Sequence, residues 1–236
     1  MYNQVGPWPK PKTKASDTPR PPLEPKRSAL LIIDLQNYSC HPDCGWTPVY
    51  KEHFPEVYAY RNPRMNELVI PNIRKLIDCA RRNQARVIYF RLGSALPDWS
   101  DVMPFHRDAA LRTLERHGRK IIANVGTFEH EVFGEIAPAP GDIVIDKTTK
   151  SAFTSTGIDQ LLRSLGVEHL VFCGAATDAC VETTARDAAD RGYHCTIVDD
   201  GCLARDQESH DASLRAFDKL FGRVMPAAAV LEEYGC

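Results

Sequence analysis

Five short, continuously apolar runs alternate with segments of helical spacing along most of this chain, and this alternation limits the folds open to it. The apolar runs cover residues 29–35, 87–90, 143–145, 170–173 and 195–198, and the helical segments cover residues 65–82, 158–165, 180–191 and 208–221. Strands without a polar face must be covered on both sides, which is typical of a parallel sheet between two layers of helices. The pattern therefore predicts an α/β doubly wound fold.

Residues 1–26 do not share this pattern. Prolines alternate there with lysines and an arginine, which blocks both a helix and an inner strand. We expect a proline-rich N-terminal arm, either free in solvent or packed against a neighbouring subunit, although Trp8 would be an unusual residue to leave in water. Residues 27–236 then form one domain, since α/β folds of this size often stay undivided.

The composition restricts the partners and the location of the protein. A formal net charge of -2 gives no reason to expect binding to nucleic acid or to an anionic membrane surface. No apolar run is long enough to span a bilayer, and the N-terminus lacks the pattern of a signal peptide. We therefore expect a cytoplasmic protein whose eight cysteines are reduced thiols.

The stretch from residue 92 to residue 140 is long and weakly periodic. Connections of this length inside a compact domain are usually functional. We expect it to contain one or two helices, at residues 108–117 and around residues 129–135, and to roof a pocket.

Three reactive side chains follow predicted strands. Asp34 ends the first strand, Lys147 follows the strand at residues 143–145, and Cys180 begins the helix after the strand at residues 170–173. Ligands of parallel sheets bind beyond the carboxyl ends of the strands. A carboxylate, an ammonium and a thiol are therefore predicted to share one edge of the sheet.

Each of these side chains also has a structural interpretation. Most free cysteines are small buried apolar residues, Asp34 could be a capped turn carboxylate, and most lysines lie at the surface. The functional interpretation is that the first turn of a helix stabilises a Cys180 thiolate and that Asp34 is a general base. Lys147 would then lower the pKa values of both groups and keep them ionised.

Residues 29–37, 147–153 and 174–188 carry these side chains in three motifs. In this order the motifs resemble the isochorismatase-like cysteine hydrolases, and the similarity extends over nearly all of residues 28–225. The resemblance implies a six-stranded parallel sheet with strand order 3-2-1-4-5-6 and helices on both faces, in a three-layer α/β/α arrangement. It also implies assembly into homodimers or homotetramers.

By the same resemblance, Asp34, Lys147 and Cys180 are the catalytic residues, with Lys150 as the competing lysine. A cis peptide maps onto the bond between Ala175 and Ala176, and the amides of Ala176 and Cys180 would form an oxyanion hole. The expected substrate contacts are Asn37, Tyr38, Arg91, Arg107, Lys150, Phe153 and Thr177.

Two departures from the family narrow the expected activity. Members that cleave the vinyl ether of isochorismate have no thiol at the position of Cys180. The nicotinamidase branch holds a metal through an Asp-x-His motif after the second strand, which residues 91–95 lack. We therefore expect no metal and no cofactor, and a small-molecule amide or ureide as substrate.

The metal-free branch acts on biuret, triuret, ureidoacrylate, N-carbamoylsarcosine and maleamate. The spacing of Asp146, Lys147 and Lys150, together with residues 186–193, looks most like the biuret and ureide hydrolases. The alternatives are a hydrolase of another small amide, such as a maleamate-like or nicotinamide-like substrate, and a non-catalytic binding member of the fold. The complete set of Asp34, Lys147 and Cys180 argues against the second alternative.

One further cluster has the composition of a metal site. Cys40 and Cys44 flank His41, which is an acceptable ligand spacing for zinc. No second pair of ligands stands out elsewhere in the sequence, so a proline-rich loop near the pocket is the favoured interpretation.

Overall fold

The computed structural model describes residues 21–236. The larger part of the predicted N-terminal arm, residues 1–20, lies outside this range. Within the described part, the 3-10 turn η1 (Pro25–Arg27) leads into the sheet. The side chain of Leu23 is buried, and its backbone amide donates a hydrogen bond of 2.8 Å to Oε2 of Glu233. Residues 21–26 therefore pack against the C-terminal end of the chain.

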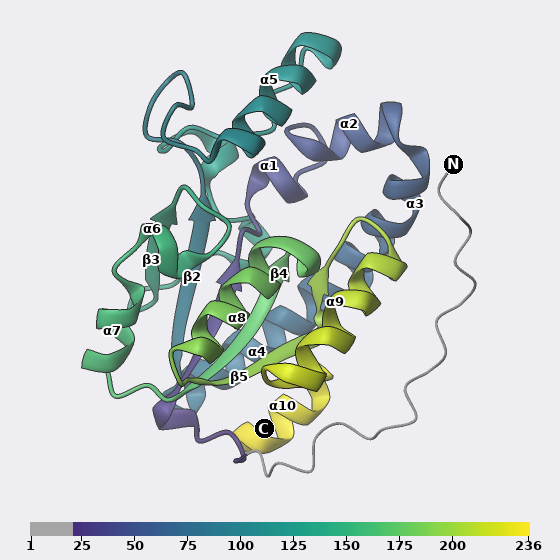
Figure 1. Cartoon of the computed structure of the whole chain (residues 1–236). Coiled ribbons are helices and arrows are strands. Elements are labelled where there is room, and N and C mark those ends of the chain that lie inside the picture. The colour runs from purple at the N-terminus through teal and green to yellow at the C-terminus, as the bar shows by residue number, and fades with distance from the viewer. Residues whose placement is uncertain (1–20) are drawn as a thin grey trace.

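A six-stranded parallel sheet with strand order β3-β2-β1-β4-β5-β6 forms the centre of the molecule (Figure 1). Both the fold class and the strand order agree with the prediction. The strands are β1 (Ser28–Ile33), β2 (Arg86–Leu92), β3 (Ile143–Lys147), β4 (His169–Ala175), β5 (His194–Leu203) and β6 (Arg223–Met225). The sequence pattern does not locate β6, because an edge strand of this length leaves too short an apolar run.

Alternate side chains of β1 enter two separate hydrophobic cores. Leu30 and Ile32 pack with α4 (Ile70–Arg82) and α10 (Ala227–Tyr234). Leu31 and Ile33 pack with α7 (Ile158–Ser164), α8 (Glu182–Asp190) and α9 (Gln207–Leu220). In Figure 1, α8 and α9 lie in front of the sheet and α4 lies behind it. The continuously apolar strands thus reflect burial on both faces.

The predicted helical segments are present, two of them with an irregular first part. Residues 65–82 comprise the π-helical turn η2 (Arg64–Val69) and α4, and residues 180–191 comprise most of the π-helical turn η5 (Thr177–Val181) and α8. The expected N-cap of the helix at residues 208–221 is confirmed, since the carboxylate of Asp206 accepts a hydrogen bond of 2.7 Å from the amide of Ser209.

The loop predicted at Cys40–Cys44 is present, since residues 41–45 lie outside any helix, between α1 (Asn37–Cys40) and α2 (Trp46–His53). A third helix, α3 (Pro55–Pro63), follows α2. Pro48 and Pro55 lie in the first turns of their helices, where a missing amide hydrogen has no consequence, and Pro63 is the last residue of α3. These three prolines are therefore compatible with the two helices, which the sequence pattern did not predict.

The long stretch after β2 has the predicted character. It contains α5 (Pro104–His117), η3 (Phe128–His130) and η4 (Gly134–Ile136), and the short helix α6 (Ala152–Ser155) follows β3. A third hydrophobic cluster joins this stretch to α2. It is formed by Val49, Trp99, Val102, Ala110, Ile121 and Ile122. The stretch therefore has a small core of its own above the sheet.

The cysteines differ from the expectation in one respect. Cys79 in α4 and Cys236 after α10 form a disulfide with a Cα–Cα distance of 6.1 Å, so the prediction of eight reduced thiols is wrong for these two. The packing of α10 on α4 brings the two residues together across 157 positions of sequence. The other six cysteines are free.

The zinc hypothesis finds no support in the loop at Cys40 and Cys44. The first thiol is buried, and the second lies 3.4 Å from the carbonyl oxygen of Asn37. Within residues 21–236, no three His, Cys, Asp or Glu side chains form a group that could hold a metal ion.

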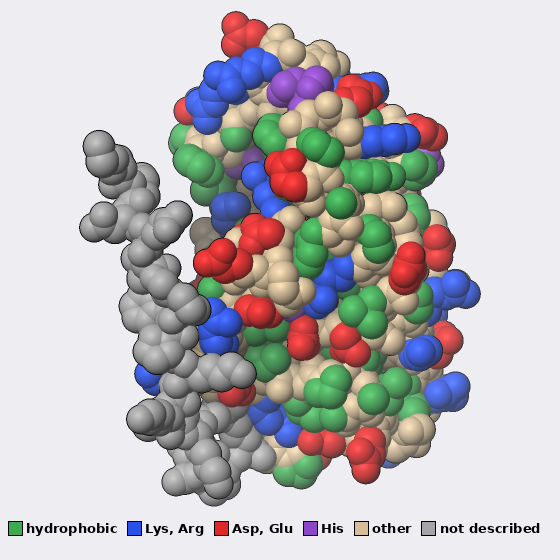
Figure 2. Space-filling model, turned by 90° about the vertical axis from the view of Figure 1, so that its right-hand side faces the viewer, with side chains coloured by type: hydrophobic (Ala, Val, Ile, Leu, Met, Phe, Trp, Pro, Cys, Tyr) green, Lys and Arg blue, Asp and Glu red, His purple; other side chains and the backbone are tan. Residues whose placement is uncertain are grey.

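The surface carries no dominant charge. Figure 2 shows acidic and basic side chains interspersed over the face that it displays, as the small net charge suggests. None of the helices between residues 21 and 236 has the length and apolar character needed to cross a membrane.

Candidate active site

Asp34 lies immediately beyond β1 in an uncommon backbone conformation. Its φ is 54°, in the left-handed region that non-glycine residues adopt at some cost. Its amide donates a hydrogen bond of 3.1 Å to the carbonyl of Phe90. Beside it, Gly174 lies so close to β1 that a Cβ atom would stand 2.1 Å from the oxygen of Ile33. Close packing of β1 and β4 thus holds the carboxylate at the edge of the sheet.

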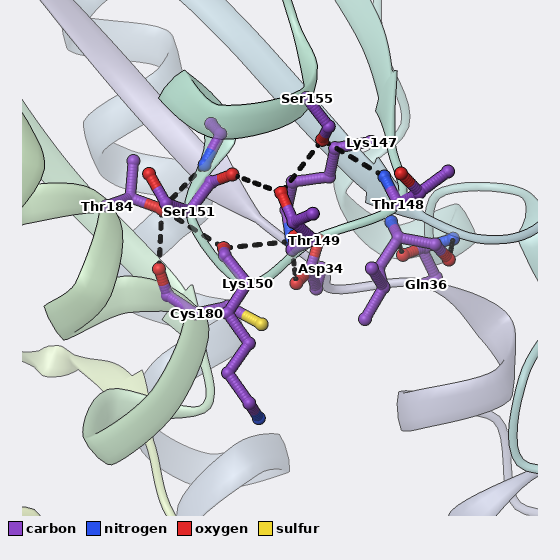
Figure 3. Close-up of polar contacts among 12 residues, drawn as sticks. Asp34, Gln36, Lys147, Thr148, Thr149, Lys150, Ser151, Ser155, Cys180 and Thr184 are labelled. Atoms are coloured by element: carbon purple, nitrogen blue, oxygen red, sulfur yellow. Dashed lines mark hydrogen bonds and ion pairs between the residues drawn. The ribbon is translucent and has the colours of Figure 1, made fainter. Parts of the chain in front are cut away.

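Lys147, the last residue of β3, forms a buried ion pair with Asp34. Its side chain is fully buried, and Nζ lies 2.8 Å from Oδ2 of Asp34. Nζ also donates to the carbonyl oxygens of Thr149 and Lys150, at 2.9 and 3.2 Å. All three ammonium hydrogens therefore have acceptors, and the side chain fixes both the carboxylate and the loop after β3 (Figure 3).

Cys180 lies in η5, directly after the carboxyl end of β4. The peptide bond between Ala175 and Ala176 is cis, at the position that the family resemblance implies. The hydroxyl of Thr184 donates a hydrogen bond of 2.6 Å to the carbonyl of Cys180 and accepts one of 3.2 Å from the amide of Ala152. This hydroxyl joins the Cys180 turn to the loop after β3. In Figure 3 the sulfur of Cys180 points toward the side of the site where Asp34 lies.

Burial governs the protonation of the Cys180 thiol, contrary to the expectation that Lys147 keeps this thiol ionised. Burial raises the pKa of the Cys180 thiol to about 12, although Lys147 lowers it. It also raises the pKa of Asp34, against the opposing effects of the ammonium charge and its hydrogen bond. For Lys147, burial lowers the pKa, but the nearby Asp34 and Cys180 outweigh it and the net shift is upward. The thiol is therefore protonated at neutral pH.

One oxygen of Asp34 is available to accept the proton of the Cys180 thiol. Oδ2 binds Lys147, whereas Oδ1 is buried without a hydrogen-bond partner in the described part of the chain. The carboxylate and the Cys180 thiol are close enough to shift each other's pKa values. An unpaired buried carboxylate oxygen beside a protonated thiol is the arrangement that a general base requires.

The thiol and the carboxylate face a cavity of about 350 Å³. Its floor includes Asp34, Cys180 and the cis-linked pair Ala175 and Ala176. The side chains around the floor come from helices α1, α2, α3 and α5 and from the loops after β3 and β5. They include Tyr38, Ser39, Trp46, Tyr50, Arg61, Phe105, His106, Lys150 and Arg205. The stretch after β2 therefore roofs the pocket through α5.

Two of the expected substrate contacts line this cavity. Tyr38 is buried and its pKa is raised well above the usual range, first by burial and then by the charges of Asp34 and Cys180, so its hydroxyl remains a donor. Lys150 lies on the loop held by Lys147, with its side chain toward the cavity.

The other expected contacts lie outside the lining and have partners of their own. Nδ2 of Asn37 donates to the carbonyl of Phe128 at 2.8 Å, and the hydroxyl of Thr177 lies 2.8 Å from Nδ1 of His210. The remaining three contact charged or aromatic neighbours. Arg91 pairs with Asp146 at 2.7 Å, Arg107 lies 3.9 Å from Asp108, and Phe153 packs under the guanidinium of Arg191.

Sequence reasoning missed several residues of the lining because they belong to helices that it did not predict. Arg61 is buried and donates hydrogen bonds of 3.0 and 2.9 Å to the carbonyl and hydroxyl oxygens of Ser39. The guanidinium of Arg205 lies 4.9 Å from the ring centre of Trp46 and 5.7 Å from that of Tyr50. Arg205 follows the observed end of β5 by two residues, but the predicted strand ended at residue 198, so the sequence offered no signal for it.

The chain is similar in sequence and in fold to known proteins. The sequence model of the isochorismatase domain matches residues 28–229. A cysteine hydrolase from Pseudomonas syringae pv. phaseolicola 1448A has 27% identity and a TM-score of 0.76, with 93% of this chain and 98% of that chain covered. An isochorismatase family protein from Desulfovibrio vulgaris subsp. vulgaris str. Hildenborough has 28% identity and a TM-score of 0.70, with coverage of 87% and 97%.

A third solved structure, an N-carbamoylsarcosine amidase from Thermoplasma acidophilum, has 29% identity and a TM-score of 0.60, with 85% of this chain and 96% of that chain covered. Members of the matched family are hydrolases. Because the family model matches residues 28–229, which are most of the chain, this protein belongs to the isochorismatase family of hydrolases.

Proposed function

We propose that the protein is a cysteine-dependent amidohydrolase that cleaves a C–N bond of a small amide or ureide. The observation that carries the proposal is the pairing of a buried, protonated Cys180 thiol with an Asp34 carboxylate whose Oδ1 has no partner in the described chain. Both face one cavity, and the buried Lys147 holds the carboxylate in place.

In the proposed reaction, Asp34 takes the thiol proton while the sulfur of Cys180 attacks the substrate carbonyl carbon. The amides of Ala176 and Cys180 stabilise the negative charge that develops on the carbonyl oxygen. As the C–N bond breaks, Asp34 returns the proton to the leaving nitrogen, and ammonia or a small amine departs. A thioester remains on Cys180.

The second half of the reaction uses the same base. Asp34 takes a proton from a water molecule as its oxygen attacks the thioester carbon. The C–S bond then breaks, the proton passes to the sulfur, and the acid product leaves. The buried Lys147 keeps Asp34 oriented through both halves, because its ammonium has no freedom to turn away from Oδ2.

The charges of the cavity support a ureide substrate with a second carbonyl or a carboxylate. Lys150, Arg61 and Arg205 line it together and supply only hydrogen-bond donors. Such donors suit the oxygens of biuret, triuret, ureidoacrylate or a carbamoyl amino acid. The similarity to an N-carbamoylsarcosine amidase favours the last class. A monoamide of a dicarboxylic acid, such as maleamate, suits the same cations and is the second candidate.

Ammonia release from a panel of these compounds tests the proposal. Wild type should release ammonia from at least one ureide or amide, and the Cys180→Ala variant should release none. Wild type that is inactive on the whole panel, or a Cys180→Ala variant that keeps more than about a hundredth of the rate, would overturn the proposal.

We also infer a homo-oligomer, either a dimer or a tetramer. The family resemblance supports this inference. Light scattering during size-exclusion chromatography gives the mass directly, and a monomer at micromolar concentration would refute the inference.

A further inference from the structure

His106 contributes a neutral polar group to the roof of the active-site cavity. It lies in the first turn of α5, which stands beyond the carboxyl end of the sheet (Figure 1). Its side chain lines the same cavity as Asp34, Cys180 and Lys150. This role could not be predicted from the sequence, because the position of α5 over the strand ends arises from tertiary packing.

The imidazole of His106 has no hydrogen-bond partner among residues 21–236. Nδ1 is buried without a hydrogen bond, and no residue between 21 and 236 forms a hydrogen bond with Nε2. Buried polar atoms in proteins are almost always paired, and exceptions occur mainly where a ligand or water completes the set. By contrast, His210 below the cavity has partners at 2.8 Å on both ring nitrogens.

The charges around His106 keep this imidazole neutral. Burial, and after it the positive charges of Lys150, Lys147 and Arg205, together lower its pKa to about 4. A neutral imidazole has one donor nitrogen and one acceptor nitrogen. At neutral pH it therefore offers an acceptor in a cavity whose cations can only donate.

An acceptor of this kind fits one part of a ureide. The oxygens of the substrate suit the donors on Lys150, Arg61 and Arg205, but none of these side chains can accept a hydrogen bond from a substrate N–H group. Asp34 is an acceptor, and its role in proton transfer occupies it. Asp178 is exposed to solvent at the rim. The hydroxyls of Tyr38 and Ser39 also line the cavity, and that of Ser39 already accepts a hydrogen bond from Arg61. Among the side chains that α5 contributes to the lining, His106 is the one with an acceptor nitrogen.

We propose that His106 is a specificity-determining residue that accepts a hydrogen bond from the N–H next to the scissile carbonyl of a ureide. The proposal rests on the proposed amidohydrolase function. It identifies the side chain that lets the site discriminate ureides from simple amides. A site that pairs a substrate N–H with a buried acceptor disfavours an analogue without that hydrogen, because the acceptor then stays unpaired.

A pair of isosteric substrates tests the proposal. N-carbamoylglycine carries an N–H where succinamate carries a methylene group, and the two are otherwise alike. The measured quantity is the ratio of kcat/KM for N-carbamoylglycine to kcat/KM for succinamate. The His106→Phe and His106→Leu variants should lower this ratio roughly fivefold to tenfold, mainly through KM, as expected for loss of one neutral hydrogen bond.

Two controls separate recognition from folding. The His106→Asn variant retains a neutral acceptor and should keep most of the ratio. The His117→Phe variant changes a histidine on the same helix that does not line the cavity, and should leave the ratio at the wild-type value. Calorimetric binding of both compounds to the Cys180→Ala variant, with and without the His106 substitutions, gives the same comparison without catalysis.

The outcomes distinguish this proposal from the proposed function. Suppose that the two compounds are hydrolysed and that the ratio of their kcat/KM values stays within twofold of wild type in both His106→Phe and His106→Leu. This result overturns the role of His106 and leaves the proposed amidohydrolase function intact. Wild type that neither hydrolyses nor binds either compound overturns the role of His106 and the ureide assignment together. A ratio that falls in His106→Phe and His106→Leu but stays near the wild-type value in His106→Asn supports the proposal.

Discussion

Replacement of Lys147 by methionine is the most informative single change to this structure. Methionine keeps the length and most of the apolar volume of the side chain while it removes the ammonium. In the native protein, Nζ of Lys147 is fully buried and binds Asp34 Oδ2 and the carbonyl oxygens of Thr149 and Lys150. The Lys147→Met variant therefore leaves one carboxylate oxygen and two carbonyl oxygens without their donor.

The expected loss of stability follows from these contacts. Removal of one partner from a buried ion pair costs about 3–5 kcal/mol, because the remaining charge is left in a poorly solvated site. The two carbonyl oxygens add about 1 kcal/mol each. Uptake of a proton by Asp34 offsets part of this cost. We therefore expect the free energy of unfolding to fall by about 4 kcal/mol at pH 7.

Urea denaturation at several pH values measures this loss. Without Lys147, the folded-state pKa of Asp34 should lie above its unfolded value, so that folded protein binds a proton that unfolded protein lacks at neutral pH. The cost should therefore be largest at pH 7 and should shrink as the pH falls toward the unfolded pKa of about 4. The Lys150→Met variant, whose ammonium has no partner in residues 21–236, is the matched control.

A loss of under about 1 kcal/mol in the Lys147→Met variant, with no dependence on pH, would refute the reasoning. It would mean that Asp34 and Lys147 do not form a buried, mutually dependent pair. A loss equal to that of Lys150→Met would refute it in the same way, since the control carries the same change in formal charge.

Four further predictions follow from the site. Iodoacetamide should inactivate the enzyme by modifying Cys180, and prior occupation of the cavity by a substrate analogue should slow both processes equally; inactivation without label at Cys180 contradicts its role as nucleophile. Activity should survive dialysis against EDTA, because residues 91–95 lack the Asp-x-His motif of the metal-dependent branch. A loss of activity that added zinc restores would contradict this prediction. Gly174→Ala should destabilise the protein by about 3 kcal/mol or more, since its Cβ would clash with the backbone of β1 and its φ is 127°, whereas Gly157→Ala, with open space around its Cβ, should change stability by less than about 1 kcal/mol; equal effects in melting experiments would be the contrary result. Because the folded pKa of His106 lies near 4, below the usual 6.5, wild type should lose stability as the pH falls from about 6.5 to about 4, by at most about 1.4 kcal/mol per pH unit, and the His106→Phe variant should lack this component.

The parallel sheet was predictable because its strands and helices leave local patterns in the sequence. Strands buried on both faces leave continuously apolar runs, and helices between them leave a different period. Asp34, Lys147 and Cys180 follow three of these runs, and the carboxyl ends of parallel strands meet at one edge. The order of strands and the position of the cis peptide came from the resemblance of the motifs, which local patterns alone do not supply.

The helices between residues 37 and 63 and the short strand β6 were beyond the local pattern. α2 carries a proline in its first turn and α3 has one at each end, so the local sequence did not mark either segment as a helix. Their stability comes from contacts such as Val49 packing with Trp99 and Ala110, which lie far away in sequence. Tertiary packing overrides weak local preference in this way wherever an element gains a hydrophobic partner.

In the active site, too, some features follow from the sequence and others from tertiary packing. The sequence by itself determined which reactive groups follow the strands, since each is attached to a strand end. Only the tertiary structure decided their protonation, because burial raises the pKa of Cys180 further than Lys147 lowers it. Only the tertiary structure decided the lining of the cavity, since Arg61, His106 and Arg205 come from separate elements. Desolvation and side-chain convergence depend on how distant segments pack, and no local spacing encodes that packing.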